Sequence, residues 1–350
     1  MLCYVDDSLP GITRKRRGRY WQYFDPRGKR ITDRGEIKRL DAIALPPAYE
    51  DAWYCPEPDG HIQAVGYDAR GRKQYRYHEE FRALREAEKY ERLAEFGRAL
   101  SRLRRRVQAE LRRRKLDRNL VTAAVVHLID SEHLRVGNES YARENRSYGA
   151  TTLRRRHARV RKGRMTLSYR GKSGIRRRVA IEDRRLGRII ERCRELKGPR
   201  LFAYLDEEDR VRTISSADVN EYIRDAMGED FSAKDFRTWA ASVIAFEKMA
   251  RRARRGRKVT LKSLIEPVAE KLGNTLAISR KSYVHPAVIE AVKKEEYEAG
   301  PFPRATKYLS PCERALILFL ENLPPRPEEG DERAARPRPA SGKAELAAAA

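Results

Sequence analysis

The sequence predicts an α+β protein, with a small β-rich N-terminal domain and a larger, mainly helical domain that carries a small β-hairpin or sheet. Two observations support this prediction. Residues 1–82 are rich in Gly, Pro, Tyr and Trp and contain short alternating segments, which are typical of strands and turns. From residue 83 onward, apolar residues recur at spacings of three and four, which is the period of an amphipathic helix.

Three strands are predicted in the N-terminal domain. Residues 20–24 precede a turn at residues 25–28, where Asp, Pro and Gly favour chain reversal. Residues 61–65 alternate in character, and a turn containing Gly and Asp leads to residues 73–77. Basic and aromatic residues interleave from Arg72 to Tyr77. This pattern suits contacts with a nucleic-acid backbone and with base edges, although a strand with one aromatic face would look similar.

The second domain, residues 83–310, begins with a long helix whose apolar stripe runs from Leu93 to Leu111, and a second helix follows over residues 121–134. Further helical patterns occur near residues 182–196, 216–227, 233–253, 258–272 and 286–297. Ser215 and Ser216 are suitable caps for the second of these. Residues 324–350 consist mainly of Pro, Arg, Glu and Ala without periodicity, so we predict a disordered tail.

Residues 151–181 interrupt the helices with a strand pattern. Met165, Leu167 and Tyr169 alternate, a second alternating segment covers residues 175–181, and residues 171–174 form a hairpin tip. Lys172 at this tip is expected to be exposed, and its simplest interpretation is a solvated turn lysine. Residues 145–181 contain 13 Lys and Arg and no Asp or Glu. Because solvated faces normally mix charges, we expect this segment to face phosphates.

The charge of the whole chain favours a polyanionic partner. Lys and Arg number 77 against 51 Asp and Glu, which gives a formal net charge of +26. A membrane is a weaker alternative, since no apolar run is long enough to span or anchor. No secretory signal is visible at the start, and the four cysteines are scattered without a CxxC spacing, as in reduced cytoplasmic proteins.

Tyr283 has the surroundings that a nucleophile for phosphodiester attack requires. The reaction needs a nucleophile, positive charge on the non-bridging oxygens and an acid for the leaving oxygen. Arg280 and Lys281 precede Tyr283 and would favour its phenolate. Arg237 lies in the first turn of a predicted helix, where a cation is disfavoured unless another group holds it. A phosphate bound there would pair with the guanidinium of Arg237 and would also accept from the free N–H groups of the helix N-terminus.

These residues also have ordinary structural interpretations. A tyrosine is most often a half-buried core residue, and Arg135, at the end of an apolar helix, could simply interact with the helix dipole. Residues 66–71 have P-loop spacing, but Arg72 and Lys73 stand where Lys-Ser/Thr is required, so no ATP site is expected. The sequence has no HExxH motif, no Cys/His cluster and no evident acidic cage, so we expect neither a metal nor another cofactor.

The motifs around these residues resemble those of the small type IB DNA topoisomerases of the viral and bacterial kind. The resemblance covers about residues 10–300, in the order of that family. Its motifs are Gly11–Arg14, Gly66–Tyr75, Arg135–Gly149, Tyr169–Gly174, Lys234–Ala240, Leu272–Thr275 and Ser282–Pro286. The resemblance implies that the β-rich domain and the helical catalytic domain close as a C-shaped clamp around duplex DNA.

The resemblance also implies a mechanism without ATP or an obligatory metal. Tyr283 attacks the scissile phosphate and becomes linked to the 3′ end, and Lys172 protonates the leaving 5′ oxygen. Arg135 and Arg237 stabilise the pentacoordinate phosphorane. Asn274 stands where many relatives carry a histidine and donates to a non-bridging oxygen, with a smaller contribution because asparagine carries no charge. The implied activity is relaxation of supercoiled DNA by transient cleavage and religation of one strand.

Seven residues are expected to contact DNA: Arg72, Gln74, Tyr75 and Tyr77 in the N-terminal domain, and Tyr141, Asn145 and Lys234 in the catalytic domain. All but Arg72 match DNA-contacting positions of the family, and Arg72 begins the basic-aromatic segment. One departure from the family pattern is Leu276, which stands where a proline is expected. We expect a monomer that acts on double-stranded DNA in the bacterial cytoplasm or nucleoid, and not at a membrane.

Two other classes of protein would share some of these features. A tyrosine recombinase uses the same chemistry, but its second arginine motif is typically His-x-x-Arg, where this chain has Lys234 three residues before Arg237. The β-rich N-terminal domain also favours the topoisomerase. A non-catalytic DNA-binding protein would account for the charge. It would not account for Arg135, Lys172 and Tyr283 in their family contexts.

Overall fold

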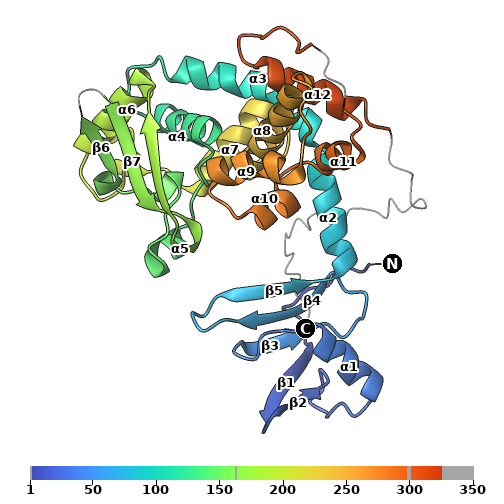
Figure 1. Cartoon of the computed structure of the whole chain (residues 1–350). Helices are drawn as coiled ribbons and strands as arrows, with labels where there is room; N and C mark the ends of the chain where they lie inside the picture. The colour runs from blue at the N-terminus through green and yellow to red at the C-terminus, as the bar shows by residue number, and fades with distance from the viewer. Residues whose placement is uncertain (1, 162–163, 298–300, 325–350) are drawn as a thin grey trace, which may run out of the picture.

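A computed structural model describes residues 2–161, 164–297 and 301–324, and it contains a sheet-rich N-terminal part and a mainly helical body (Figure 1). The predicted α+β class is therefore confirmed. In these ranges no helix is both long and apolar enough to cross a membrane. The predicted disordered tail, residues 324–350, lies outside the described residues apart from Pro324, so it stays a prediction.

The N-terminal part is a five-stranded antiparallel sheet in the order β2-β1-β3-β4-β5. Its strands are β1 (Ile12–Arg17), β2 (Tyr20–Phe24), β3 (Glu50–Tyr54), β4 (Ile62–Tyr67) and β5 (Lys73–Tyr77). The three predicted strands correspond to β2, β4 and β5. Ile12, Tyr23 and Tyr54 of the sheet form one buried cluster with Leu40 of α1 (Arg34–Ala42). Helix α1 was not predicted.

Helix α2 (Glu79–Glu91) leads from the sheet into the body and spans the predicted domain boundary. The longer helices of the body are α3 (Leu93–Glu110), α4 (Arg118–Glu132), α6 (Arg184–Glu195), α7 (Ser216–Met227), α8 (Asp235–Ala253), α9 (Leu261–Leu272), α11 (Pro286–Lys294) and α12 (Pro311–Glu321). All but α12 correspond to predicted helices. Two short helices that were not predicted, α5 (Glu139–Glu144) and α10 (Leu276–Ser282), lie close to the candidate site.

The core of the body forms around α3, α4 and α8. Helix α3 buries the predicted apolar stripe, and α4 buries most of its length. Phe96 of α3 makes edge-to-face contacts with Phe231 and Phe236, at ring-centre distances of 5.2 and 5.1 Å. These contacts fix the N-terminal end of α8 against α3. They therefore also fix Arg237, which follows Phe236.

The predicted hairpin consists of β7 (Arg164–Arg170) and β8 (Arg176–Ile181), and β6 (Ala158–Arg161) completes an antiparallel sheet in the order β6-β7-β8. Tyr169 pairs with Arg177 across the hairpin, and the turn is the short 3₁₀ helix η3 (Lys172–Gly174). A third, two-stranded sheet, formed by β9 (Ala203–Leu205) and β10 (Val211–Thr213), was not predicted.

Figure 1 shows the N-terminal sheet at one end of α2 and the helical body at the other, with α5 and α10 on the side of the body that faces β5. The two parts also touch away from α2. The guanidinium carbon of Arg72 lies 5.4 Å from the ring centre of Tyr141 on α5. This contact joins two of the residues that were predicted to contact DNA.

Candidate active site

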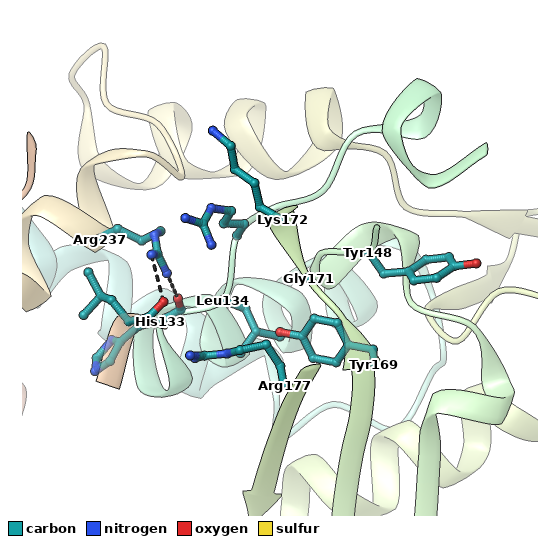
Figure 2. A pocket seen from close by; sticks show the side chains of 10 residues that line it. His133, Leu134, Tyr148, Tyr169, Gly171, Lys172, Arg177 and Arg237 are labelled. Atoms are coloured by element: carbon teal, nitrogen blue, oxygen red, sulfur yellow. Dashed lines mark hydrogen bonds between the residues drawn. The ribbon is translucent and has the colours of Figure 1, made fainter. Parts of the chain in front are cut away.

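Arg237 is the central cation of the candidate site. It lies in the first turn of α8, as predicted, and only 4% of its surface is exposed. Its Nη1 donates to the carbonyl of His133 at 2.6 Å, and its Nη2 donates to the carbonyl of Leu272 at 3.0 Å (Figure 2). Nη2 also donates to Oδ1 of Asn274 at 3.2 Å. Protein oxygens thus hold the guanidinium. Burial, together with the charge of Arg135, lowers its pKa to about 10, so it remains a cation at neutral pH.

Arg135 lies in the loop that follows α4. The helix is ended by His133 in the left-handed conformation, with a φ of 56°. The carbonyl of Arg135 accepts from the N–H of Ala150 at 2.8 Å, and Gly149 packs so closely that a Cβ there would lie 2.5 Å from the same oxygen. Only glycine allows this approach. The loop is thereby fixed with Nη2 of Arg135 at 2.8 Å from Oδ1 of Asn274.

Asn274 follows α9, which ends at Gly273 in the left-handed conformation with a φ of 62°. Its Oδ1 accepts hydrogen bonds from both Arg135 and Arg237. Two cationic donors on one oxygen establish which end of the amide is which. Nδ2 is buried and has no hydrogen-bond partner among the described residues. A buried donor of this kind is costly unless a ligand accepts from it.

Tyr283 directly follows α10, and its ring lies near two cations. The guanidinium carbon of Arg237 is 5.2 Å from the ring centre, and the ammonium of Lys89 is 5.7 Å from it. Burial alone would raise the pKa of the phenol, but the charges and hydrogen bonds of Arg237 and Arg135 outweigh burial and hold this pKa below its usual value. From α8, Ser242 Oγ donates to the carbonyl of Tyr283 at 3.5 Å.

Lys172 lies beside this cluster without packing into it. It is exposed at the tip of the β7–β8 hairpin, as predicted, and Figure 2 shows its side chain extending outward, away from Tyr169. With Arg135 and Arg237 it lines a hollow of about 10 Å³, close to the space of one water molecule.

The arrangement offers a phosphate several donors at once. Arg135, Arg237 and Lys172 supply positive charge, Asn274 supplies a neutral donor, and Tyr283 supplies a hydroxyl whose ionisation the arginines favour. Within the described ranges, no three His, Cys, Asp or Glu side chains come together as possible metal ligands. The cations and the amide donor of this cluster can stabilise negative charge on the oxygens of a bound phosphate.

The predicted DNA-contacting residues of the N-terminal domain lie on its surface. Tyr75 and Tyr77 are exposed and stack on each other, with ring centres 5.7 Å apart and an interplanar angle of 11°. Arg72 pairs with Asp68 at 2.6 Å, and Gln74 donates to the same carboxylate at 3.1 Å. Asp68 thus holds two of the four residues in place.

The other three predicted contacts belong to the helical body. Tyr141 is exposed on α5, and Asn145 ends this helix, with a buried Nδ2 that has no partner in the described part of the chain. Lys234 is exposed directly before α8, three residues ahead of Arg237. These positions are compatible with DNA contact, and their role stays a prediction.

Two cations near the site were not singled out from the sequence. Arg177 on β8 donates to the carbonyl of Lys271 at 3.1 Å and covers Gly273, where a Cβ would lie 2.2 Å from its Nη1. Arg177 occupies a position of β8 in the alternating series of apolar residues, and this pattern could have marked it in the sequence as a side chain that points inward. Lys89 on α2 donates to the carbonyl of Ser282 at 2.5 Å. No local pattern marks Lys89, because its partner lies far away along the chain.

Comparison with known protein families yields two matches. Residues 78–300 match the model described as "Eukaryotic DNA topoisomerase I, catalytic core", and residues 20–68 match "Bacterial DNA topoisomerase IB, N-terminal domain". The DNA topoisomerase 1B of Acanthamoeba polyphaga mimivirus is 32% identical over 288 residues, which cover 79% of this chain and 85% of the viral protein. The DNA topoisomerase 1B of vaccinia virus (strain Copenhagen) is 21% identical over 255 residues, which cover 71% of this chain and 77% of the viral protein.

Among solved structures, the XerH site-specific recombinase bound to difH substrate in a pre-cleavage complex is 16% identical in sequence, with a TM-score of 0.33. The alignment covers 56% of this chain and 53% of the recombinase.

Proposed function

The chain belongs to the type IB DNA topoisomerases, and on this premise we propose that it relaxes supercoiled DNA by cutting one strand through a 3′-phosphotyrosyl bond to Tyr283 and then rejoining it. The reaction uses neither ATP nor an obligatory metal. The observation that carries the proposal is the convergence of Tyr283, Arg135, Arg237 and Asn274, which come from separate segments of the chain.

In the cleavage step, the phenolate oxygen of Tyr283 forms a bond to the scissile phosphorus, and the bond from phosphorus to the 5′ oxygen breaks. The phenolic proton passes to solvent, and Lys172 donates a proton to the departing 5′ oxygen. Arg135 and Arg237 neutralise the charge that builds on the non-bridging oxygens. Nδ2 of Asn274 donates to one of them, because Oδ1 is already occupied by the arginines. Religation is the reverse reaction.

The two parts of the chain, residues 1–82 and 83–310, form the two sides of a C-shaped clamp in this proposal. Arg72, Gln74 and the stacked pair of Tyr75 and Tyr77 contact duplex DNA from the N-terminal side. Tyr141, Asn145 and Lys234 contact it from the catalytic side. Because Arg72 also touches Tyr141, duplex DNA enters only after that contact parts. The net charge of +26 supports a polyanionic substrate.

The enzyme acts as a monomer in the bacterial cytoplasm or nucleoid, and the match to a bacterial N-terminal domain supports this setting. The direct test is incubation with a supercoiled plasmid that carries no special site, in EDTA and without ATP. The wild-type protein relaxes the plasmid, whereas Tyr283→Phe folds, binds DNA and neither relaxes it nor forms a denaturant-resistant adduct. An adduct with the Phe variant, or a requirement for paired sites and a tetramer, would overturn the proposal.

A further inference from the structure

Lys89 reaches from α2 into the helical body and ends beside the nucleophile. Its Nζ donates to the carbonyl of Ser282 at 2.5 Å, across 193 positions in the sequence. Ser282 is the last residue of α10, and Tyr283 follows it directly. The carbonyls in the last turn of a helix lack partners within the helix. A positive charge is also favoured at this end of a helix. Lys89 therefore supplies both a donor for the free carbonyl and a favourable charge.

The ammonium of Lys89 also faces aromatic rings. It lies 4.5 Å from the ring centre of Tyr90 and 5.7 Å from that of Tyr283. Burial lowers the pKa of Lys89, while Glu86 on α2, Tyr283 and Asp235 on α8 act in the opposite direction. Arg237 and Arg135 are the cations that lower the pKa of the Tyr283 phenol, and Lys89 is a third cation beside the same ring.

We propose that Lys89 is a positioning residue for Tyr283, holding the end of α10 so that the nucleophile has a fixed place, and that it connects this place to the helix that carries the N-terminal domain. The inference rests on the proposed role of Tyr283 as the nucleophile. Lys89 donates to the carbonyl of Ser282, the residue before Tyr283, and Ser242 donates to the carbonyl of Tyr283 itself. The backbone of the nucleophile is thus held from two helices.

The geometry explains why such support is needed. Helix α10 has only seven residues, and Tyr283 leaves it with φ of −131° and ψ of −42°, outside the helical conformation. A short helix is poorly stable by itself. Displacement of a reacting group by about 1 Å can cost roughly a hundredfold in rate. Lys89 therefore links the position of α2 directly to the reaction rate.

The test compares Lys89→Met, which keeps the length of the side chain but loses its charge and donors, with Lys89→Arg, which keeps both. The adjoining cavity of about 250 Å³, lined by Lys89, Arg85 and Arg92, gives the larger guanidinium room. Lys262→Met is the control, because it removes an exposed lysine of α9 whose ion-pair partner is Glu266, at 3.8 Å. Single-turnover formation of the covalent adduct is measured on a nicked duplex from pH 6 to 9, with DNA binding and thermal unfolding recorded for each variant.

We expect Lys89→Met to bind DNA as wild type does and to form the adduct roughly tenfold more slowly at neutral pH, with the rate profile moved upward by roughly one pH unit, since a cation near the phenol is lost. Lys89→Arg restores most of the rate, and Lys262→Met matches wild type. A wild-type rate and profile for Lys89→Met would overturn the inference. So would a loss that is equal at every pH and not relieved by Lys89→Arg, which would indicate a purely structural role. Absence of any adduct with the wild-type protein would instead contradict the proposed function.

Discussion

Nη2 of Arg135 donates to Oδ1 of Asn274 at 2.8 Å, and this bond orients the amide at the centre of the candidate site. The neutral residue thereby becomes a donor at any pH. A histidine would behave differently in such surroundings. Two neighbouring histidines, His133 and His285, have pKa values lowered to about 4, mainly by burial.

The first prediction follows from this orientation. Asn274→Asp replaces the donor with a second acceptor and adds negative charge beside the phosphate, so adduct formation should slow by roughly 10²–10³-fold. Asn220→Asp is the matched control, because its Oδ1 accepts from the N–H of Ala233 at 3.0 Å and a carboxylate can do the same. The rates are compared in single-turnover cleavage of a nicked duplex. If Asn274→Asp cleaves as fast as Asn220→Asp, the amide does not donate to the phosphate.

The second prediction concerns the exposed Lys172. If it protonates the leaving oxygen, Lys172→Ala should slow cleavage of ordinary DNA by roughly 10²–10⁴-fold. A substrate with sulfur in the 5′-bridging position should restore the rate of this variant, because a thiolate leaves without a proton. Tyr283→Phe should gain nothing from the same sulfur. An equal effect of sulfur on wild type and Lys172→Ala would remove the lysine from this role.

Periodicity was sufficient to predict the elements that bury a continuous apolar face. Helix α3 shows this, because its stripe packs against α4 and α8, and so does the β7–β8 hairpin, whose alternation continues through Val179 and Ile181. Short elements carry too few residues for a period to emerge. Helix α10 and helix α5 have seven and six residues, and strands β9 and β10 have three each. These elements form because their neighbours hold them.

Some residues of the site could likewise be predicted from the sequence, and others could not. Motif resemblance pointed to Arg135, Arg237 and Asn274, and the structure brings both arginines within hydrogen-bond distance of Oδ1 of Asn274. Motifs could not reveal that Arg237 is held by backbone carbonyls, since these belong to any residue. Nor could they reveal Lys89, whose function depends on a carbonyl far away in the sequence.

The third prediction tests the hydrogen-bond network that joins α8 to α3, α4 and α12. Arg104 of α3 donates to Glu313 of α12 and to Asp130 of α4, both at 2.8 Å, and Trp239 of α8 donates to Glu313 at 3.2 Å. Burial raises the pKa of Glu313, but the hydrogen bond and charge of Arg104 outweigh it, so this pKa is below its ordinary value. A carboxylate of this kind stabilises the fold fully above its unfolded pKa, about 4.3, and this contribution is lost as the pH falls through the folded pKa.

Glu313→Gln should therefore lower the free energy of unfolding by about 2–3 kcal/mol at pH 7, since Arg104 loses one of its two carboxylate partners. The difference from wild type should shrink as the pH falls below about 4. Urea unfolding followed by circular dichroism at several pH values measures both effects. Glu290→Gln is the control, because it breaks an exposed pair with Lys293 and should change little. Equal losses in the two variants would mean that the buried network does not stabilise the body.

The fourth prediction separates backbone contact from base recognition. DNA affinity should fall steeply with salt, at a log–log slope of about −0.9 per neutralised phosphate. Lys234→Ala, which removes an exposed cation before α8, should reduce that slope by about one unit and weaken all sequences alike. Equilibrium binding at several salt concentrations measures the slope. An unchanged slope in this variant would mean that Lys234 does not touch a phosphate.

Gln74 should behave in the opposite way. Its Nε2 donates to Asp68 at 3.1 Å, so its amide must leave this carboxylate, or share it, to reach a base edge. Gln74→Ala should keep the salt slope and should reduce the difference in binding free energy between preferred and other cleavage sites by roughly 1–3 kcal/mol. Asp68→Asn should alter the same site preferences, because Asp68 holds both Gln74 and Arg72. Cleavage-site maps that stay unchanged in Gln74→Ala, with affinity lowered equally for all sequences, would show that β5 contacts only the DNA backbone.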